Sequence, residues 1–565
     1  MRRRDRPGIR ARRVSPLAAG VLAALIAALA LTLTAHPAPA PVSPRAAIDA
    51  ALHVPRVEWI LSGSHWNRAV ASPIDPKLEQ VNFYAGGRIV AAVALEHGRT
   101  PTQEIDYRHM KIPYGDWIAY EPALLVVLCG LFVVMAGVAP WRRLRNLDVA
   151  AALSLVVSVV LFQHRYIELS LLAALPGMVY LLLRCAARAF APARDPVPSR
   201  PLLAALTPGL DAGRRVRWLR ALLVVLALVY VMVGVSSFAP VDVIYAVMEG
   251  ATTLIHGVLP YGHMPPGVIH GDTYPILTYL LYTPLALVAP VATVWDSVDG
   301  GLLVAVLAAL VAAWGVFRIV AGGRRRAGVR RPAEVEEAGL RAALAWLAFP
   351  PLLITASTGT TDVALAAMLV FAVLLWRRPA ACSALLAVAG WFKLAPFVLL
   401  PVCAAPLRGR RLAAAVAAVA AVSLPMLVVL IALGGWRGPA DMIHAVSYQF
   451  SRGSLQSFWG ALGLGSLQPF AEACVLGLVA SAVVKLRLEP ELAADRARMA
   501  ALTASILIGL QVSANYWAFL YLVWVIPLAG VSLLADDGVA AQARARRLQR
   551  SRSGEPCPAV GSAAQ

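Results

Sequence analysis

Long apolar runs alternate with short polar connections along most of the chain. Apolar runs lie near 17–35, 122–139, 149–163, 169–185, 219–238, 301–320, 341–356, 363–376, 381–407, 412–433, 465–485, 498–513 and 517–534. Many of them approach the ~20 residues that a helix needs to cross the hydrocarbon core of a membrane. The pattern predicts an all-α polytopic membrane protein with a bundle of about 12 to 14 membrane helices.

Basic residues are concentrated in every second connection between the apolar runs. WRRLRN (141–146), the stretch 184–220, AGGRRRAGVRR (321–331) and RGRR (408–411) are strongly basic, and the chain begins and ends with Arg-rich segments. The positive-inside rule places these segments in the cytoplasm, together with both termini. The run 17–35 is then an uncleaved signal-anchor, although an Ala-Pro-Ala sequence at 38–40 leaves cleavage open.

One apolar segment, 274–290, does not fit this alternation. It is broken by Pro275, Pro284 and Pro290, and if it crossed the membrane it would place 321–331 outside. We therefore expect a re-entrant or surface-lying pair of half-helices. Non-helical backbone at membrane depth is tolerated only when protein or a cavity surrounds it, so this segment is expected to contribute to a site.

These assignments divide the chain into five parts. Residues 1–35 form the basic tail and signal-anchor, and 36–120 a small extracytoplasmic module. Accessory membrane helices and a basic loop occupy 121–218, the main membrane domain 219–535, and a disordered cytoplasmic tail 536–565.

Composition excludes a set of soluble domains, because 59% of the residues are apolar and only 15% are charged. The net charge of +20 follows membrane topology and does not indicate nucleic-acid binding. The preponderance of Arg over Lys suggests a GC-rich bacterial genome and hence a bacterial inner membrane. No Walker A loop, HExxH motif, nucleophile elbow or CxxC pair occurs, which argues against an ATP-driven pump and a zinc site.

Polar side chains gather in the first outer loop of the main domain, 241–274. Asp242, Tyr245 and Glu249 recur at helical spacing, with an apolar face opposite, so we expect an amphipathic helix at the membrane surface. Further candidates follow it: Tyr261, His263, His270, Asp272 and Tyr274. A solvated helix and loop would show the same pattern, but the broken segment directly after it favours the rim of an active site.

Lys393 lies between two short apolar helices that we expect to hinge at 393–396. A charge at this depth is costly and indicates function, such as binding a lipid-linked phosphate, although snorkelling to a headgroup is the alternative. Asp362 is expected to cap a helix. The outer loop 434–460 carries Arg452 and Trp459, which suit a sugar or phosphate, or an interfacial aromatic belt.

VDVIY, HGVLPYG, TYPILTYLLYTPLALV and GWFKLAPFVLLP together resemble the GT-C membrane glycosyltransferases, and most closely glycosyltransferase family 87. The resemblance covers 219–535. Ile276 stands where that family has a second proline, and the first 200 residues are an extension that it does not usually carry.

The resemblance implies an inverting, GT-C-type hexosyltransferase acting outside the cytoplasm. A polyprenyl-phosphate donor would supply mannose or another hexose or pentose to a glycolipid or glycan acceptor. Asp242 would be the general base, and Lys393 with His263 or His270 would bind the donor phosphate. A divalent ion, Mg²⁺ or Mn²⁺, could bridge Asp242 or Asp272 to that phosphate. A lipid transporter or flippase and a non-catalytic envelope-assembly protein remain as alternatives.

Overall fold

A computed structural model describes residues 43–73, 78–108, 114–138, 144–190, 202–237, 239–265, 268, 270–293, 296–326, 329, 331–451 and 456–534. The predicted signal-anchor at 17–35, the predicted tail 536–565 and the candidate Arg452 lie outside these residues.

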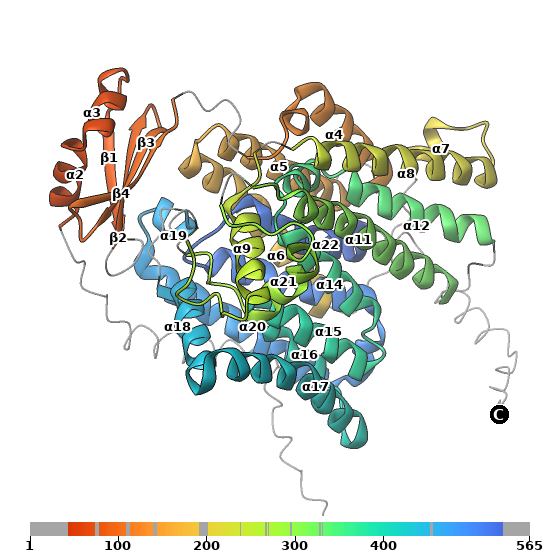
Figure 1. Cartoon of the computed structure of the whole chain (residues 1–565). Helices are drawn as coiled ribbons and strands as arrows, with labels where there is room; N and C mark the ends of the chain where they lie inside the picture. The colour runs from red at the N-terminus through yellow and green to blue at the C-terminus, as the bar shows by residue number, and fades with distance from the viewer. Residues whose placement is uncertain are drawn as a thin grey trace, which may run out of the picture.

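The chain begins with a small mixed α/β unit (Figure 1). Its antiparallel sheet has the order β1-β2-β3-β4, and its elements are α2 (Pro44–Leu52), α3 (Pro55–Ser62), β1 (Arg68–Pro73), β2 (Leu78–Ala85), β3 (Arg88–Glu96) and β4 (Thr100–Asp106). Gly86 and Gly87 join β2 to β3 with φ of 56° and 86°, the conformation that a tight hairpin requires. The sequence predicted a module here but not its sheet.

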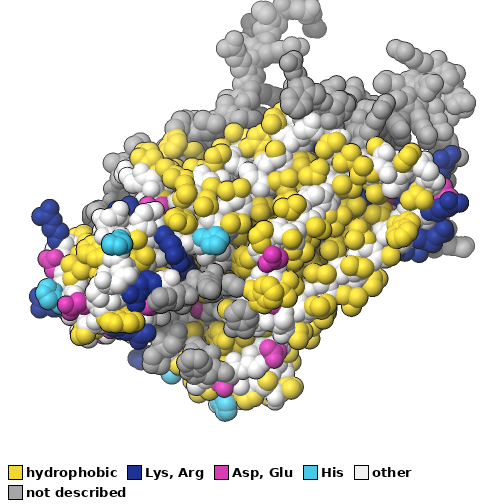
Figure 2. Space-filling view, turned by 90° about the horizontal axis from the view of Figure 1, so that it is seen from above, with side chains coloured by type: hydrophobic (Ala, Val, Ile, Leu, Met, Phe, Trp, Pro, Cys, Tyr) yellow, Lys and Arg dark blue, Asp and Glu magenta, His cyan; other side chains and the backbone are white. Residues whose placement is uncertain are grey.

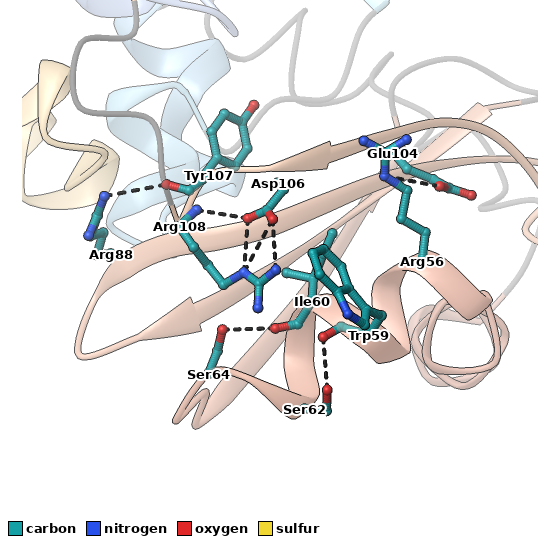
Figure 3. Close-up of polar contacts among 10 residues, drawn as sticks. All are labelled: Arg56, Trp59, Ile60, Ser62, Ser64, Arg88, Glu104, Asp106, Tyr107 and Arg108. Atoms are coloured by element: carbon teal, nitrogen blue, oxygen red, sulfur yellow. Dashed lines mark hydrogen bonds and ion pairs between the residues drawn. The ribbon is translucent and has the colours of Figure 1, made fainter.

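The helices α2 and α3 bury an apolar face against this sheet. Ala51 and Ile60 pack with Phe83 and Leu95 in a core of their own. Figure 3 shows the polar contacts around α3, where Arg108 is held by Asp106, with Nη2 to Oδ2 at 2.8 Å.

The remainder is helical, which confirms the prediction of an all-α polytopic membrane protein. Six helices in the described part of the chain are long and apolar enough to span: Leu144–Gln163 (α5), Ile167–Phe190 (α6), Ala212–Val235 (α8), Asp299–Arg326 (α11), Gly409–Phe450 (α17, Gly409–Gly434, continued by α18, Gly438–Ser451) and Gly465–Leu488 (mainly α20, Gln468–Leu488). A pair bent by 57°, α12 (Pro332–Leu347) and α13 (Pro350–Ser357), adds a seventh span if it is counted as one.

Other predicted spans appear as shorter helices. They are α4 (Pro122–Ala136), α14 (Asp362–Leu374), α15 (Pro379–Phe392), η3 with α16 (Ala395–Leu399 and Leu400–Ala404), α21 (Arg496–Ser513), and η7, α22 and η8 (Phe519–Tyr521, Leu522–Ala529 and Gly530–Leu534). Figure 2 shows a broad hydrophobic surface between an end rich in Lys and Arg and an opposite end with mixed charges and His. Arg324, Arg325 and Arg326 lie in the last turn of α11.

Two segments differ in detail from the sequence-based expectation. The broken segment forms one helix, α10 (Ile276–Ala286), instead of a pair, and its 11 residues cover roughly 17 Å, too little to cross a ~30 Å core. The expected outer loop 434–460 begins as the helix α18, which continues α17 after Gly435.

The turn between α13 and α14 joins three parts of the molecule. Asp116, which follows the N-terminal sheet, donates its N–H to the Ser357 hydroxyl at 3.3 Å. Val241, directly before α9 (Asp242–Ile255), donates its N–H to the carbonyl of Thr358 at 3.0 Å. Residues 357–361 therefore connect the N-terminal unit, α9 and the helix that Asp362 begins.

Candidate functional site

The break after α15 places Lys393 at the end of a helix. Pro396 has no N–H to bond the carbonyl of Phe392, four residues earlier, and the Thr278 hydroxyl of α10 donates to that carbonyl instead. Gly390 lets the chain fold back, because a Cβ there would lie 2.4 Å from the Phe397 ring. The hinge predicted at 393–396 is thus confirmed, with Lys393 in extended conformation.

Asp362 faces Lys393 from the first residue of α14. The Lys393 ammonium lies 2.5 Å from Oδ1 of Asp362, and the two side chains are 15% and 1% exposed. The Trp524 indole N–H donates to the same oxygen at 2.8 Å. Thr360 donates its hydroxyl to Oδ2. The predicted capping role of Asp362 is wrong, because its carboxylate is committed to these three donors; a buried carboxylate is stable only when it is paired in this way.

Three aromatic rings lie close to the ammonium. The Lys393 nitrogen lies 4.9 Å from the centre of the Tyr521 ring, 5.0 Å from Trp524 and 5.8 Å from Tyr274. Ring faces attract a cation at these distances. Lys393 is therefore held at a fixed place by one carboxylate and three rings.

Lys393 lines a cavity of about 350 Å³. Five segments form its walls: 273–275, 393–398, the end of α18, the end of α21 with 514–516, and 521–524. Most of the wall is apolar or aromatic, and Gln449, Gln511 and Asn515 add amide groups. A few amides and one charge in an apolar cavity are typical of a site that orients a small polar group.

The amides are themselves held in place. Gln449 donates to the hydroxyl of Thr273 at 2.7 Å, and that hydroxyl donates to the carbonyl of His270 at 3.1 Å. The His270 ring stacks on Tyr448, with ring centres 4.2 Å apart. Thr273 and Gln449 thus link the loop after α9 to α18 at the edge of the cavity, and His270 lies next to this link.

Of the residues expected to form the site, Lys393 and Tyr274 line the cavity. Asp242 is exposed at the start of α9, and its carboxylate accepts from the Val243 N–H at 2.9 Å. It also lies near Tyr107, where burial, then Tyr114 and finally Asp242 raise the pKa of Tyr107 to about 12. The residues lining the cavity do not include Asp242.

Of the stripe predicted along α9, Asp242, Tyr245 and Glu249, only Asp242 is exposed. Glu249 is only 3% exposed, and burial, reinforced by Asp296, raises the pKa of its carboxyl to about 7. Tyr245 is partly buried, and burial with Asp299 raises the pKa of its hydroxyl. The Val291 N–H donates to the Thr252 hydroxyl at 3.0 Å, so the chain after α10 packs against α9, and the expected surface helix is partly enclosed.

The other expected residues have structural contacts. The Tyr261 hydroxyl donates to the carbonyl of Tyr274 at 3.1 Å, and Asp272 accepts from the Gly262 N–H at 2.9 Å, so both shape the loop 261–274. His263 is exposed. The Trp459 indole donates to the carbonyl of Val512 at 2.8 Å and is not among the residues lining the cavity.

Sequence reasoning missed Asp362, Trp524, Tyr521 and Gln511 as parts of this site. A signal existed for Asp362: it is an acidic residue at the start of an apolar run, where a charge indicates function. Asn515 and Tyr516, in the connection between the predicted spans 498–513 and 517–534, line the cavity, whereas Trp517 is fully buried. Trp524 and Tyr521 lie in an apolar run, where nothing in the sequence distinguishes a residue of the site from an aromatic residue that only packs.

A divalent ion finds no cluster of ligands here. Among the described residues, no group of three or more His, Cys, Asp or Glu is arranged to hold a metal ion. Asp272, one of the two expected ligands, accepts from the Gly262 N–H through Oδ2.

The fold and the cavity together define a polytopic helical membrane protein in which one lysine and three amide side chains line a mostly apolar cavity. The family model of glycosyltransferase family 87 matches residues 273–520, just under half of the chain. This range contains Lys393, Asp362 and nearly all of the cavity wall. The match confirms the resemblance found in the sequence and indicates a membrane glycosyltransferase. No curated protein and no solved structure matches the chain.

Proposed function

We propose that this protein transfers a sugar from a polyprenyl-phosphate donor to a glycolipid or glycan acceptor at the outer face of a bacterial inner membrane. The supporting observation is the position of Lys393, held in a cavity of about 350 Å³ by Asp362 and three aromatic rings. A cation at that place suits the phosphate of a lipid-linked sugar, and the amides and rings around it suit the sugar itself.

In this proposal the ammonium of Lys393 stabilises the leaving group. An acceptor hydroxyl attacks the anomeric carbon, the bond to the phosphate oxygen breaks, and the phosphate departs with the bonding electrons. The charge that develops on that oxygen is stabilised by Lys393, which is already positioned before the reaction begins. The geometry inverts at the anomeric carbon because the new bond forms opposite the one that breaks.

The acceptor proton needs a base, and Asp242 is the proposed one. It is exposed, and its neighbour Val241 is bonded to Thr358, four residues before Asp362. The turn 357–361 thereby connects the proposed base to the phosphate-binding lysine. For this step the anomeric carbon of the donor has to lie between Lys393 and Asp242, close enough for the carboxylate to accept the proton of the attacking hydroxyl.

The test is transfer by the full chain in proteoliposomes with radiolabelled polyprenyl-phosphate mannose, glucose or arabinose. We expect Lys393→Met and Asp242→Asn each to lower transfer at least 100-fold, with Lys393→Arg retaining part of the activity. Unchanged transfer by folded Lys393→Met would contradict the proposal. Movement of the donor across the bilayer without transfer by the wild-type protein would favour the transporter alternative.

A further inference from the structure

Arg165 occupies a backbone position that favours glycine. Its φ of 68° lies in the left-handed region, in the turn between α5 and α6. The Arg165 N–H donates to the carbonyl of Phe162 at 3.0 Å, and the Tyr166 N–H donates to that of Leu161 at 3.0 Å. This pair of bonds ends a helix whose left-handed residue is usually glycine. A larger residue persists in this conformation only where its surroundings hold it, and such residues are concentrated at functional sites.

The N-terminal unit supplies contacts that hold Arg165. Its carbonyl accepts from the Ile89 N–H at 3.2 Å, and the residue is only 6% exposed. The guanidinium carbon lies 4.5 Å from the centre of the Tyr107 ring and 5.1 Å from that of the Tyr114 ring, distances at which ring faces attract a cation. Arg88 donates to the carbonyl of Tyr107 at 3.3 Å (Figure 3). Arg165 therefore fixes two tyrosines that follow β4.

The segment that contains Tyr114 packs against the chain just before α9. The Gly115 N–H donates to the carbonyl of Ala239 at 2.5 Å, in an antiparallel bridge three residues before Asp242. The Tyr120 hydroxyl donates to the carbonyl of Tyr114 at 2.9 Å. Tyr114 directly precedes this bridge, so it is held close to the proposed base.

The electrostatic interactions of both tyrosines agree with this placement. Burial raises the pKa of the Tyr107 hydroxyl to about 12, and Tyr114 and Asp242 contribute to the rise. Burial also raises the pKa of the Tyr114 hydroxyl, Arg165 opposes that rise, and Asp242 adds to it. Both hydroxyls are therefore protonated at neutral pH and can donate hydrogen bonds. Both rings are partly buried, and a ring with a donating hydroxyl suits a sugar.

We infer that the N-terminal extension forms part of the acceptor site, in which Tyr107 and Tyr114 bind the acceptor sugar beside Asp242 and Arg165 is the residue that positions both rings. The inference rests on the proposed function, in which Asp242 accepts the proton of the acceptor hydroxyl. Neither tyrosine is among the residues that line the cavity at Lys393. The two tyrosines therefore act on binding of the acceptor and leave binding of the donor unchanged.

The test is the proteoliposome transfer assay with the full chain, in which a glycolipid extract of its native membrane is the acceptor. The concentrations of donor and acceptor are varied separately. We expect Tyr107→Phe and Tyr114→Phe each to raise the acceptor KM about fivefold, the effect of one lost hydrogen bond, with the donor KM unchanged. Arg165→Gly should raise the acceptor KM about tenfold, since both rings lose their support. This variant should fold, because glycine adopts a φ of 68° without steric cost.

Arg68→Gln is the matched control. Arg68 also stacks on a tyrosine, 4.3 Å from the centre of the Tyr84 ring, and binds Glu168 of α6 at 2.7 Å. It therefore joins the N-terminal unit to the membrane helices through a similar contact, and its variant should keep the wild-type acceptor KM.

Three outcomes would overturn the inference. They are an unchanged acceptor KM in folded Arg165→Gly, an equal rise of the donor KM in that variant, and an equal rise of the acceptor KM in Arg68→Gln, which would assign the effect to docking of the N-terminal unit. Absence of transfer by the wild-type protein with every donor would instead contradict the proposed function itself, and the inference with it.

Discussion

The ammonium of Lys393 lies 2.5 Å from the carboxylate of Asp362, and each residue stands at a helix boundary. Lys393 ends α15, and Asp362 begins α14. The ion pair therefore holds the end of α15 against the start of α14.

This pair gives a ranked prediction for stability. Lys393→Met leaves a carboxylate that is 1% exposed, whereas Asp362→Asn leaves an ammonium that is 15% exposed and surrounded by rings. We expect Lys393→Met to cost more, up to about 3–5 kcal/mol. The double variant, Lys393→Met with Asp362→Asn, should be more stable than Lys393→Met alone, because neither charge of the pair remains. Thermal unfolding in detergent measures the order, and a double variant less stable than both single ones would contradict it.

Trp524 acts on Asp362 through one hydrogen bond. Trp524→Phe keeps an aromatic face near Lys393 but removes the indole N–H that lies 2.8 Å from the carboxylate. We expect a loss of about 1.5–3 kcal/mol, the range for a hydrogen bond to a charged group. Trp314→Phe is the matched control, because that ring is about half exposed on α11. Equal thermal midpoints for the two variants would show that the bond to Asp362 contributes nothing.

The raised pKa of the Glu249 carboxyl predicts that the stability of the protein depends on pH. Burial and Asp296 raise the pKa of its carboxyl from 4.5 to about 7. The folded protein thus holds this proton more tightly than the unfolded chain, and stability is lost as pH rises from about 4.5 through 7. Glu249→Gln should match the wild-type protein near pH 4.5 and exceed its stability at pH 8 by at most about 3 kcal/mol.

The measurement is thermal unfolding of both proteins across this pH range. Glu58→Gln, at an exposed position on α3, should show no such divergence from the wild-type protein. If Glu249→Gln followed the wild-type curve at every pH, the carboxyl would not be buried in the folded protein.

A substitution at Gly390 tests whether the chain folds back at the hinge 393–396. Gly390→Ala would place a Cβ 2.4 Å from the Phe397 ring, and we expect a cost of about 1–3 kcal/mol from overpacking. Gly390→Ala with Phe397→Leu should recover part of that loss. Gly130→Ala, where nothing lies within 4 Å of the new Cβ, is the control and should be neutral. A neutral Gly390→Ala would mean that the chain does not fold back at this point.

The features that depend on the local sequence pattern, the membrane helices and their breaks, were predictable from the sequence. Runs of apolar residues predicted the bundle, and the hinge at 393–396 was predicted as well. The prolines at 275, 284 and 290 predicted a segment that does not span, but as a pair of half-helices and not as the single helix α10. Pairing across the chain was not predictable in this way. Asp362 was interpreted as a cap because its own neighbours suggested one, and only the fold brings it to Lys393, 31 residues later. Glu249 likewise follows an amphipathic pattern, but in the folded protein its side chain is only 3% exposed.

The contacts of the turn 357–361 also bear on how far the chain can be shortened from its N-terminus. Ser357 accepts from Asp116, Thr358 accepts from Val241, and Thr360 donates to Asp362. A protein expressed without its first 200 residues would lack the Asp116 contact, and the side of the turn that now faces the N-terminal unit would be uncovered. Although the family match begins only at residue 273, we expect the smallest stable unit of this protein to extend well upstream of that residue.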